Sequence, residues 1–289
     1  MSYPQASPTR ERAAKPRGRI AERIGRQILD AVSTEIPQAW LCGPALVFSP
    51  HPDDESLACG GTILRKTEAG VKVKVVLLTD GSASHDLLPM ERLKELRREE
   101  LERAGRILGV SGCYYLDIQD RKLNEQIPYA VDRVLEILRS EQPADVYLPF
   151  SREPDRQAFD HVVANRIVMQ ALALYRRNIT IWEYPVWFWL HWPWVGMMQS
   201  GWPIGTRHVA WNSAADLFGL RTYWNFRGYV RIGEVLARKQ AALAQHRSQM
   251  EQLVADPRWT TLGQVCAGEF LNCFYQDREY FRVYPFHSA

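Results

Sequence analysis

The stretch Ser49-Pro-His-Pro-Asp-Asp-Glu55 places one imidazole and three carboxylates within five residues. Negative charges so close together repel one another unless something positive lies among them. Spaced three residues apart, the side chains of His51 and Asp54 can point to one side of a helical turn and bind one cation. Asp53 is offset by about 100° in such a turn, so it would miss the cation and reach a water molecule beside it. The pattern predicts a metal site with a general base.

A hydrolytic zinc site uses three protein ligands and leaves one position open for water. The third ligand is predicted to be His161, which follows the strand expected at residues 145–150. Two histidines and one carboxylate then describe a site where zinc polarises a carbonyl and zinc-bound water is the nucleophile, with Asp53 accepting its proton. The same ligands would also accept iron, cobalt or manganese.

Simpler structural interpretations of the first motif stay open. Aspartates commonly cap the helix that follows a turn, which would explain Asp53 or Asp54 but not His51. Glu55 either supports the turn or hydrogen-bonds His51 as an outer partner. The Gly60-Gly61 pair lacks the further residues of a phosphate-binding loop, so no dinucleotide site is expected.

Further motifs follow the first one along the chain. They are Thr79-Asp80-Gly81, Arg97-Arg98-Glu99-Glu100, Asp160-His161 and His246-Arg247-Ser248-Gln249. In this order, over roughly residues 43–250, the chain resembles the LmbE/PIG-L family of zinc-dependent N-acetylglucosaminyl deacetylases. The resemblance implies a Rossmann-like three-layer sandwich and hydrolysis of an N-acyl amide on a glucosamine-type sugar. It also implies His51, Asp54 and His161 as zinc ligands, Asp53 as general base, and Arg97 or Arg98 as a contact for the sugar.

One position departs from the family's pattern. The family's first histidine of His-x-Asp-His helps to stabilise the tetrahedral intermediate, and this chain has Ala158 there. Losing a donor to the oxyanion typically costs about 2.7–4 kcal/mol of transition-state stabilisation. The candidates to replace that donor are Gln157, Tyr147, Arg152 and His246. Protonation of the leaving nitrogen is assigned either to protonated Asp53 or to His246.

Other candidate residues also have ordinary structural roles. Asp120 binds a sugar hydroxyl or opens the next turn, and Asp80 lies near the site or only begins a turn. Arg97 and Arg98 belong to a helix rich in both charges, where solvated ion pairs are common. The tryptophans concentrated after residue 186 either pack in a core or cover a substrate.

Strands and helices alternate from residue 45 to residue 186. Strands are predicted at 45–49, 71–79, 113–116, 145–150 and 179–186, and helices at 19–35, 57–69, 90–108, 127–138, 159–175 and 234–253. This alternation predicts an α/β fold with a mainly parallel sheet. Ligands of such sheets bind beyond the carboxyl ends of the strands, where the motifs are expected to converge.

Length and composition limit the remaining interpretations. The 289 residues, with 46% hydrophobic residues and a net charge of +3, are typical of a globular protein and do not favour nucleic acid as a partner. We expect a basic tail and helix at 1–40 and one deacetylase-like domain at 41–289, with a tryptophan-rich insertion at about 185–230. Five cysteines without Cys-x-x-Cys spacing, and the absence of a signal peptide, favour the cytoplasm. The most hydrophobic window, 185–198, is too short to span a bilayer.

The sequence therefore predicts a cytoplasmic, zinc-dependent N-deacetylase that acts on a small amino-sugar conjugate. One alternative keeps the metal but hydrolyses a longer N-acyl amide on a glycolipid or glycopeptide. Another is a metal-binding scaffold with weak or no catalysis, because Ala158 replaces the family's histidine. The aglycone, the acyl group and the oligomeric state, with a homo-oligomer as one option, stay open.

Overall fold

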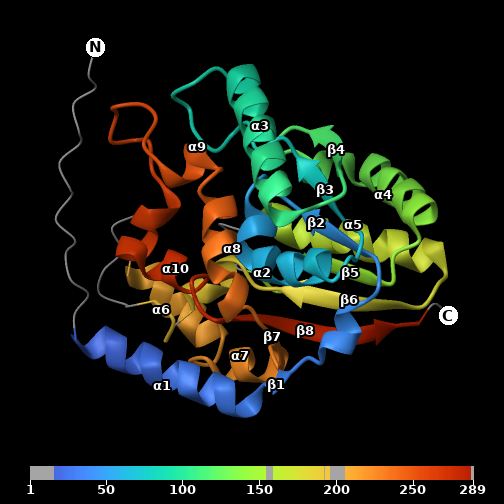
Figure 1. Cartoon of the computed structure of the whole chain (residues 1–289). Helices are drawn as coiled ribbons and strands as arrows, with labels where there is room; N and C mark the ends of the chain where they lie inside the picture. Colours follow the sequence, from blue (N-terminus) through green and yellow to red (C-terminus); the bar gives the residue numbers. More distant parts are fainter. Residues whose placement is uncertain (1–15, 154–158, 192, 196–205, 288–289) are drawn as a thin grey trace.

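A computed structural model describes residues 16–153, 159–191, 193–195 and 206–287. Within these residues eight strands form one sheet in the order β1-β7-β8-β6-β5-β2-β3-β4 (Figure 1). The strands are β1 (Thr34–Glu35), β2 (Ala45–Ser49), β3 (Val73–Thr79), β4 (Cys113–Ile118), β5 (Asp145–Pro149), β6 (Ile179–Tyr184), β7 (Gly228–Arg231) and β8 (Arg278–Phe286). Strand β8 runs antiparallel to both of its neighbours, and every other pairing is parallel.

The five predicted strands, β2 to β6, lie side by side and are all parallel. Strands β2 and β5 are buried at every position, because helices cover both faces of the sheet and both strands are mostly apolar; the buried Asp145 of β5 pairs with Lys66 at 2.7 Å. The predicted α/β fold with a mainly parallel sheet is confirmed. The strand predicted from residue 71 begins at Val73, and the one predicted to end at residue 116 continues to Ile118.

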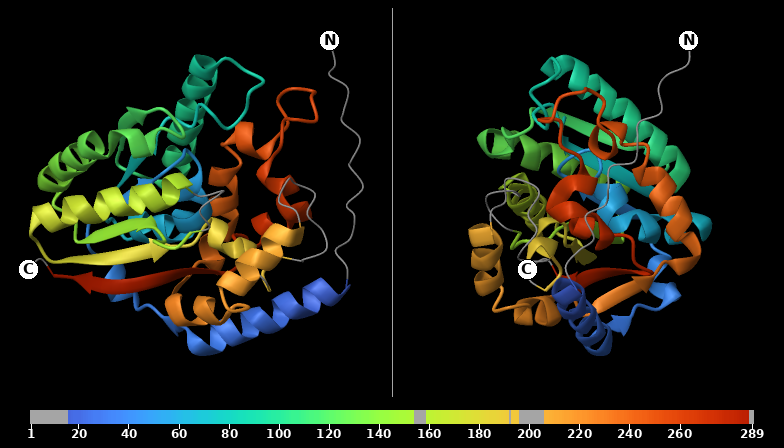
Figure 2. Two further views of the ribbon diagram at one scale, coloured as in Figure 1. Left: turned by 180° about the vertical axis from the view of Figure 1, so that it is seen from behind. Right: turned by 90° about the vertical axis from the view of Figure 1, so that its left-hand side faces the viewer.

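Helices form a layer on each side of the sheet. The α-helices are α1 (Pro16–Val32), α2 (Asp54–Glu68), α3 (Met90–Leu108), α4 (Ile127–Glu141), α5 (Phe159–Tyr175), α6 (Thr206–Ala215), α7 (Leu220–Asn225), α8 (Leu236–Leu243), α9 (Arg247–Met250) and α10 (Glu269–Asn272). Helices α4 and α5 pack together on one face of the sheet, and α2, α3 and α8 pack together on the other (Figures 1 and 2). Successive residues of β2 alternate between the two cores, as the pleat requires.

Helices α3 and α5 begin and end where the sequence predicts. Helix α3 stops at Gly109, whose φ of 74° is a left-handed conformation that glycine adopts without strain. The first predicted helix also forms as α1, but its isoleucines face outward. Ile20 and Ile24 are 58% and 51% exposed, while the inner face uses the small Gly25 against Pro193.

The single helix predicted at 234–253 is wrong. The chain forms a 3-10 turn at Gly233–Val235, then α8, and breaks before α9. At the break His246 turns inward and its ring lies 3.1 Å from the carboxylate of Glu55. Tertiary hydrogen bonds of this kind override helical propensity, which is only a weak local preference.

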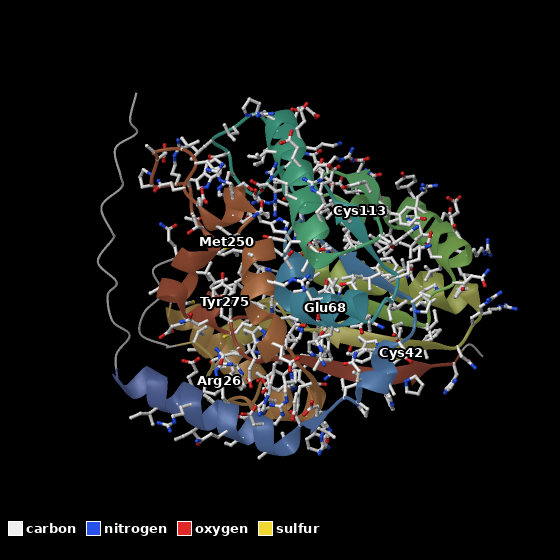
Figure 3. All side chains as sticks on the ribbon, in the orientation of Figure 1. Arg26, Cys42, Glu68, Cys113, Met250 and Tyr275 are labelled. Atoms are coloured by element: carbon white, nitrogen blue, oxygen red, sulfur yellow. The ribbon has the colours of Figure 1, made fainter. Side chains whose placement is uncertain are left out.

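Two further features concern the cysteines and the hydrophobicity of the helices. All five cysteines are free, and two of them, Cys42 and Cys113, are labelled in Figure 3. Among the residues that the structure describes, none of the helices combines the length and the apolar character that crossing a bilayer requires.

Candidate active site

A cavity of about 590 Å³ opens beyond the carboxyl ends of the parallel strands. Residues that follow five different strands line it, as the sheet topology predicts. They include His51, Asp53 and Asp54 after β2, Ala83 and Ser84 after β3, Asp120 and Arg121 after β4, Phe159 and Asp160 after β5, and Val186 and Trp187 after β6. The motifs predicted to converge do lie together.

Asp53 lies at the turn where β2 passes into α2. Its φ is 147°, a conformation that residues other than glycine rarely adopt. Its carbonyl accepts hydrogen bonds from the N–H groups of Ser56 and Leu57, but its side chain makes no capping bond. Capping by the Asp53 carboxylate therefore does not explain this residue, and the side chain is directed to the cavity instead.

The three predicted metal ligands form one cluster. Asp54 Oδ2 lies 3.4 Å from His51 Nδ1 and 3.3 Å from His161 Nε2. One donor atom from each residue fits within 4.8 Å of the other two. Such a cluster can hold one cation in the geometry predicted from the sequence.

Whether these residues fit a metal can be judged from the surroundings of the His161 ring. Its ring is fully buried, and within the described residues neither ring nitrogen has a hydrogen-bond partner. A buried polar atom without a partner is costly, and a bound cation would remove that cost. Burial, opposed by the charge of Asp54, lowers the pKa of His161 to about 4. The ring is then neutral at physiological pH, with a lone pair for a metal.

The second nitrogen of His51 contacts two further carboxylates. His51 Nε2 lies 3.4 Å from Asp120 Oδ1 and 3.6 Å from Asp160 Oδ2. Carboxylates in this position orient a ligating imidazole and fix which nitrogen carries the proton. Asp160 also accepts the N–H of Arg121 at 3.0 Å. Asp120 thus lines the cavity, as a substrate contact would, and faces His51 at the same time.

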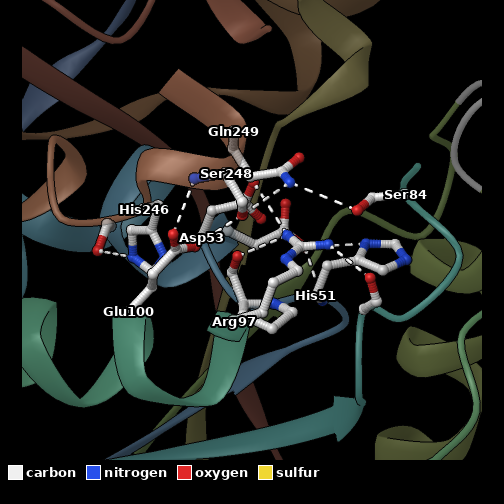
Figure 4. Close-up of polar contacts among 12 residues, drawn as sticks. His51, Asp53, Ser84, Arg97, Glu100, His246, Ser248 and Gln249 are labelled. Atoms are coloured by element: carbon white, nitrogen blue, oxygen red, sulfur yellow. Dashed lines mark hydrogen bonds and ion pairs between the residues drawn. The ribbon is translucent and has the colours of Figure 1, made fainter. Parts of the chain in front are cut away.

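Arg97 reaches Asp53 from α3. Its guanidinium lies 3.4 Å from Asp53 Oδ2 and donates to the carbonyl oxygens of Pro52 and Gly81 (Figure 4). A Cβ at residue 81 would lie 2.5 Å from Arg97 Nη1, which explains the glycine there. Burial, only partly offset by Arg97, raises the pKa of Asp53 to about 7. A carboxylate with that pKa can both accept and return a proton near neutral pH.

Two predicted residues lie away from the cavity. Arg98 pairs with Asp117 at 2.7 Å, packs over the ring of Tyr115, and is not among the residues that line the cavity. His246 is fully buried behind the site and does not line the cavity either.

Of the candidates for the oxyanion donor, Tyr147, Arg152 and His246 belong to the described residues, and none of these three lines the cavity. Gln157 and Ala158 lie outside the residues that the structure describes. Tyr147 stacks on Trp182 in the core, and Arg152 is exposed and does not line the cavity.

Several lining residues were not assigned to the site from the sequence, although one of the two interpretations of the tryptophans after residue 186 places them over a substrate. Trp187 stacks on Phe270 with ring centroids 4.8 Å apart and lines the cavity. The concentration of tryptophans after residue 186 was the available signal for it. Arg121, whose φ is 67°, and Thr260 also line the cavity, but no local pattern distinguishes either of them in the sequence.

Glu153 supports the wall that carries Trp187 and leads to a pH-dependent prediction. Its Oε1 accepts the N–H of Val186 at 2.6 Å, and burial raises its pKa to about 8. An unfolded glutamate ionises near pH 4.5, so the native state loses stability as pH rises from there to 8. We expect Glu153→Gln to stabilise the metal-free protein by on the order of 3 kcal/mol at pH 8 and by little at pH 5. Urea unfolding at both pH values measures this, and an equal effect at both would contradict it.

Comparison with known proteins identifies relatives. Residues 46–172 match the family model described as PIG-L, GlcNAc-PI de-N-acetylase. A diacetylchitobiose deacetylase from Thermococcus kodakarensis is 34% identical over 122 residues, which cover 39% of this chain and 44% of the relative. A 1D-myo-inositol 2-acetamido-2-deoxy-alpha-D-glucopyranoside deacetylase from Nocardia farcinica is 28% identical over 244 residues, 72% of this chain and 80% of the relative. The chain spans about half the length of the first curated relatives that it matches.

The fold also has solved counterparts. An N,N'-diacetylchitobiose deacetylase from Pyrococcus horikoshii, solved with an inhibitor, superposes with a TM-score of 0.62 and 22% sequence identity. The match covers 95% of this chain and 94% of that chain, so it includes both the parallel strands and the later segments.

Proposed function

Since this chain belongs to the PIG-L (LmbE-like) family, we propose that it is a metal-dependent amide hydrolase that removes the acetyl group from an N-acetylglucosamine-type sugar conjugate. The single observation that carries the proposal is the group of His51, Asp54 and His161, with Asp53 beside it at one cavity. The names of relatives from two genera describe deacetylation of such sugars.

The proposed mechanism assigns one task to each group. A divalent cation held by His51, Asp54 and His161 would polarise the amide carbonyl and acidify water, and zinc suits this donor set. Asp53 takes the proton from the attacking water and gives it to the leaving nitrogen, which departs as the sugar amine while acetate is released. Arg97 keeps Asp53 oriented through its contact at 3.4 Å.

The cavity has a polar part suited to a sugar. Asp120 can accept hydrogen bonds from sugar hydroxyls, and Trp187 offers an aromatic surface against which a pyranose ring packs. The volume of about 590 Å³ lies within the usual range for sites that enclose a small ligand. These features support a soluble amino-sugar conjugate as the substrate class.

A specific observation favours one second candidate, a longer N-acyl group. One wall of the cavity is apolar and combines Leu57, Val186, Leu262 and Val265 with Trp187. An acetyl group would cover little of that wall. A longer acyl chain would cover more of it and exclude water, and binding would gain about 25 cal/mol of free energy per Å² of apolar surface buried.

Release of amine from a panel of glucosamine conjugates tests both candidates. The panel pairs acetyl with octanoyl amides on the same sugar, and each is assayed with zinc and with a chelator. Faster release from the acetyl members supports deacetylation, and faster release from the octanoyl members supports the second candidate. If zinc binds but no amide is cleaved, the scaffold alternative that follows from Ala158 replaces both.

A further inference from the structure

Glu55 and His246 form a buried pair behind the candidate active site. Both side chains are fully buried, and neither lines the cavity. His246 Nε2 lies 3.1 Å from Glu55 Oε1 and 3.2 Å from Ser56 Oγ. A carboxylate that is cut off from water needs a positive or donating partner, and His246 supplies it from 191 residues further along the chain.

The other oxygen of Glu55 holds the backbone of Asp53. Glu55 Oε2 accepts the Asp53 N–H at 3.1 Å and lies 3.2 Å from the hydroxyl of Ser49 at the end of β2. The Asp53 φ of 147° persists only if the surroundings enforce it, because an L-residue avoids that conformation. Glu55 is the group placed to enforce it.

The backbone conformation at Asp53 decides where two side chains point. It sends the Asp53 carboxylate to the cavity and to Arg97, while the next residue, Asp54, turns to His51 and His161. Loss of the Glu55 contact would allow the turn to relax and would move the base relative to the metal ligands.

The segment that carries His246 is also bound to α3. Two residues after it, Ser248 donates from its N–H and its hydroxyl to the carboxylate of Glu100 in α3, at 2.8 and 2.7 Å (Figure 4). The break between α8 and α9 turns the His246 ring toward α2. Through these contacts, α3 and α9 are linked to the start of α2.

We propose that His246 is a positioning residue that, through Glu55, fixes the backbone of Asp53 and the direction of its carboxylate. The inference rests on the proposed function for its catalytic consequence. It replaces the two roles that the sequence suggested for His246, the acid that protonates the leaving nitrogen and the oxyanion donor, since both require a side chain in the cavity.

The test compares His246→Leu and His246→Gln with a matched control, His191→Leu. His191 is also a buried histidine but lies in the tryptophan-rich segment, 3.9 Å from Asp216. In the metal-free proteins, we expect amide hydrogen exchange of residues 49–57 to be faster in His246→Leu than in the wild type and unchanged in the control. With zinc, kcat of His246→Leu should fall by about 10- to 100-fold with KM nearly constant. His246→Gln, which keeps a donor, should recover part of both effects.

Each outcome decides the proposal. Unchanged exchange in His246→Leu overturns it, and a lower kcat with unchanged exchange would mean that His246 acts directly on the substrate. If the leucine variant does not fold, His246→Asn makes the same comparison, because its amide is too short to reach Glu55. An inactive wild type would end the proposed function, whereas the exchange measurement on metal-free protein would still decide the positioning role.

Discussion

Replacement of Asp53 by asparagine is expected to lower kcat by about 10²- to 10⁴-fold, the usual contribution of a general base. The amide keeps the size of the carboxylate, so it can remain beside Arg97, which lies 3.4 Å from Asp53 Oδ2. Because an amide cannot accept the proton, the loss should appear in kcat and not in zinc binding. Steady-state kinetics together with zinc titration of the same preparation measure both quantities.

The control for this substitution is Asp117→Asn. Asp117 pairs with Arg98 and is nearly half exposed, and it does not line the cavity. Its replacement should leave kcat unchanged. Wild-type kcat in Asp53→Asn with full zinc occupancy would remove Asp53 from the mechanism and favour a base elsewhere.

Replacement of His161 by alanine is expected to abolish both metal binding and amide hydrolysis. The ring contributes a neutral nitrogen 3.3 Å from Asp54 Oδ2, and the two remaining ligands cannot complete a three-ligand site. Removing the buried ring also leaves a cavity in the core beneath the site, so some loss of stability should accompany the loss of metal. Metal analysis after dialysis, unfolding by urea and the amine-release assay report on each effect separately.

His191→Ala provides the comparison for His161→Ala, because it also removes a buried imidazole, but one that belongs to neither group of possible metal ligands among the described residues. It should lose stability and keep its metal. Zinc retained by His161→Ala at wild-type affinity would show that the site has another third ligand and would contradict the assignment. Wild-type protein that has been depleted of metal should regain amide hydrolysis when zinc is added back.

The first motif and the strands around it could be predicted because their determinants are local. An apolar run followed by Pro-His-Pro-Asp-Asp is readable without tertiary information, and β2 and α2 form there. The sequence also contained enough information to predict that Arg97, and not Arg98, faces the site. Arg97 follows Leu93 by one turn and precedes Leu101 by another, so it shares their buried face, and all three are at most 2% exposed.

Other features depend on partners far away in the sequence. The helix break at His246 results from contacts with Glu55 and, through Ser248, with Glu100. Strand β8 is recognisable only once β6 and β7 present their edges to it. Local periodicity contains no information on either, because the free energy that decides them comes from residues that are distant along the chain.

The division of the cavity between the two halves of the chain has an evolutionary consequence. The metal-ligand cluster and Asp53 lie within residues 46–172, the part that matches the family model, whereas the apolar wall, except for Leu57, draws on residues 186–265. Apart from His246, which contacts Glu55 behind the site, the later half can therefore diverge without altering the groups proposed to cleave the amide. Grafting that wall from one relative onto another is a direct route to new acyl or sugar preferences on an unchanged catalytic base.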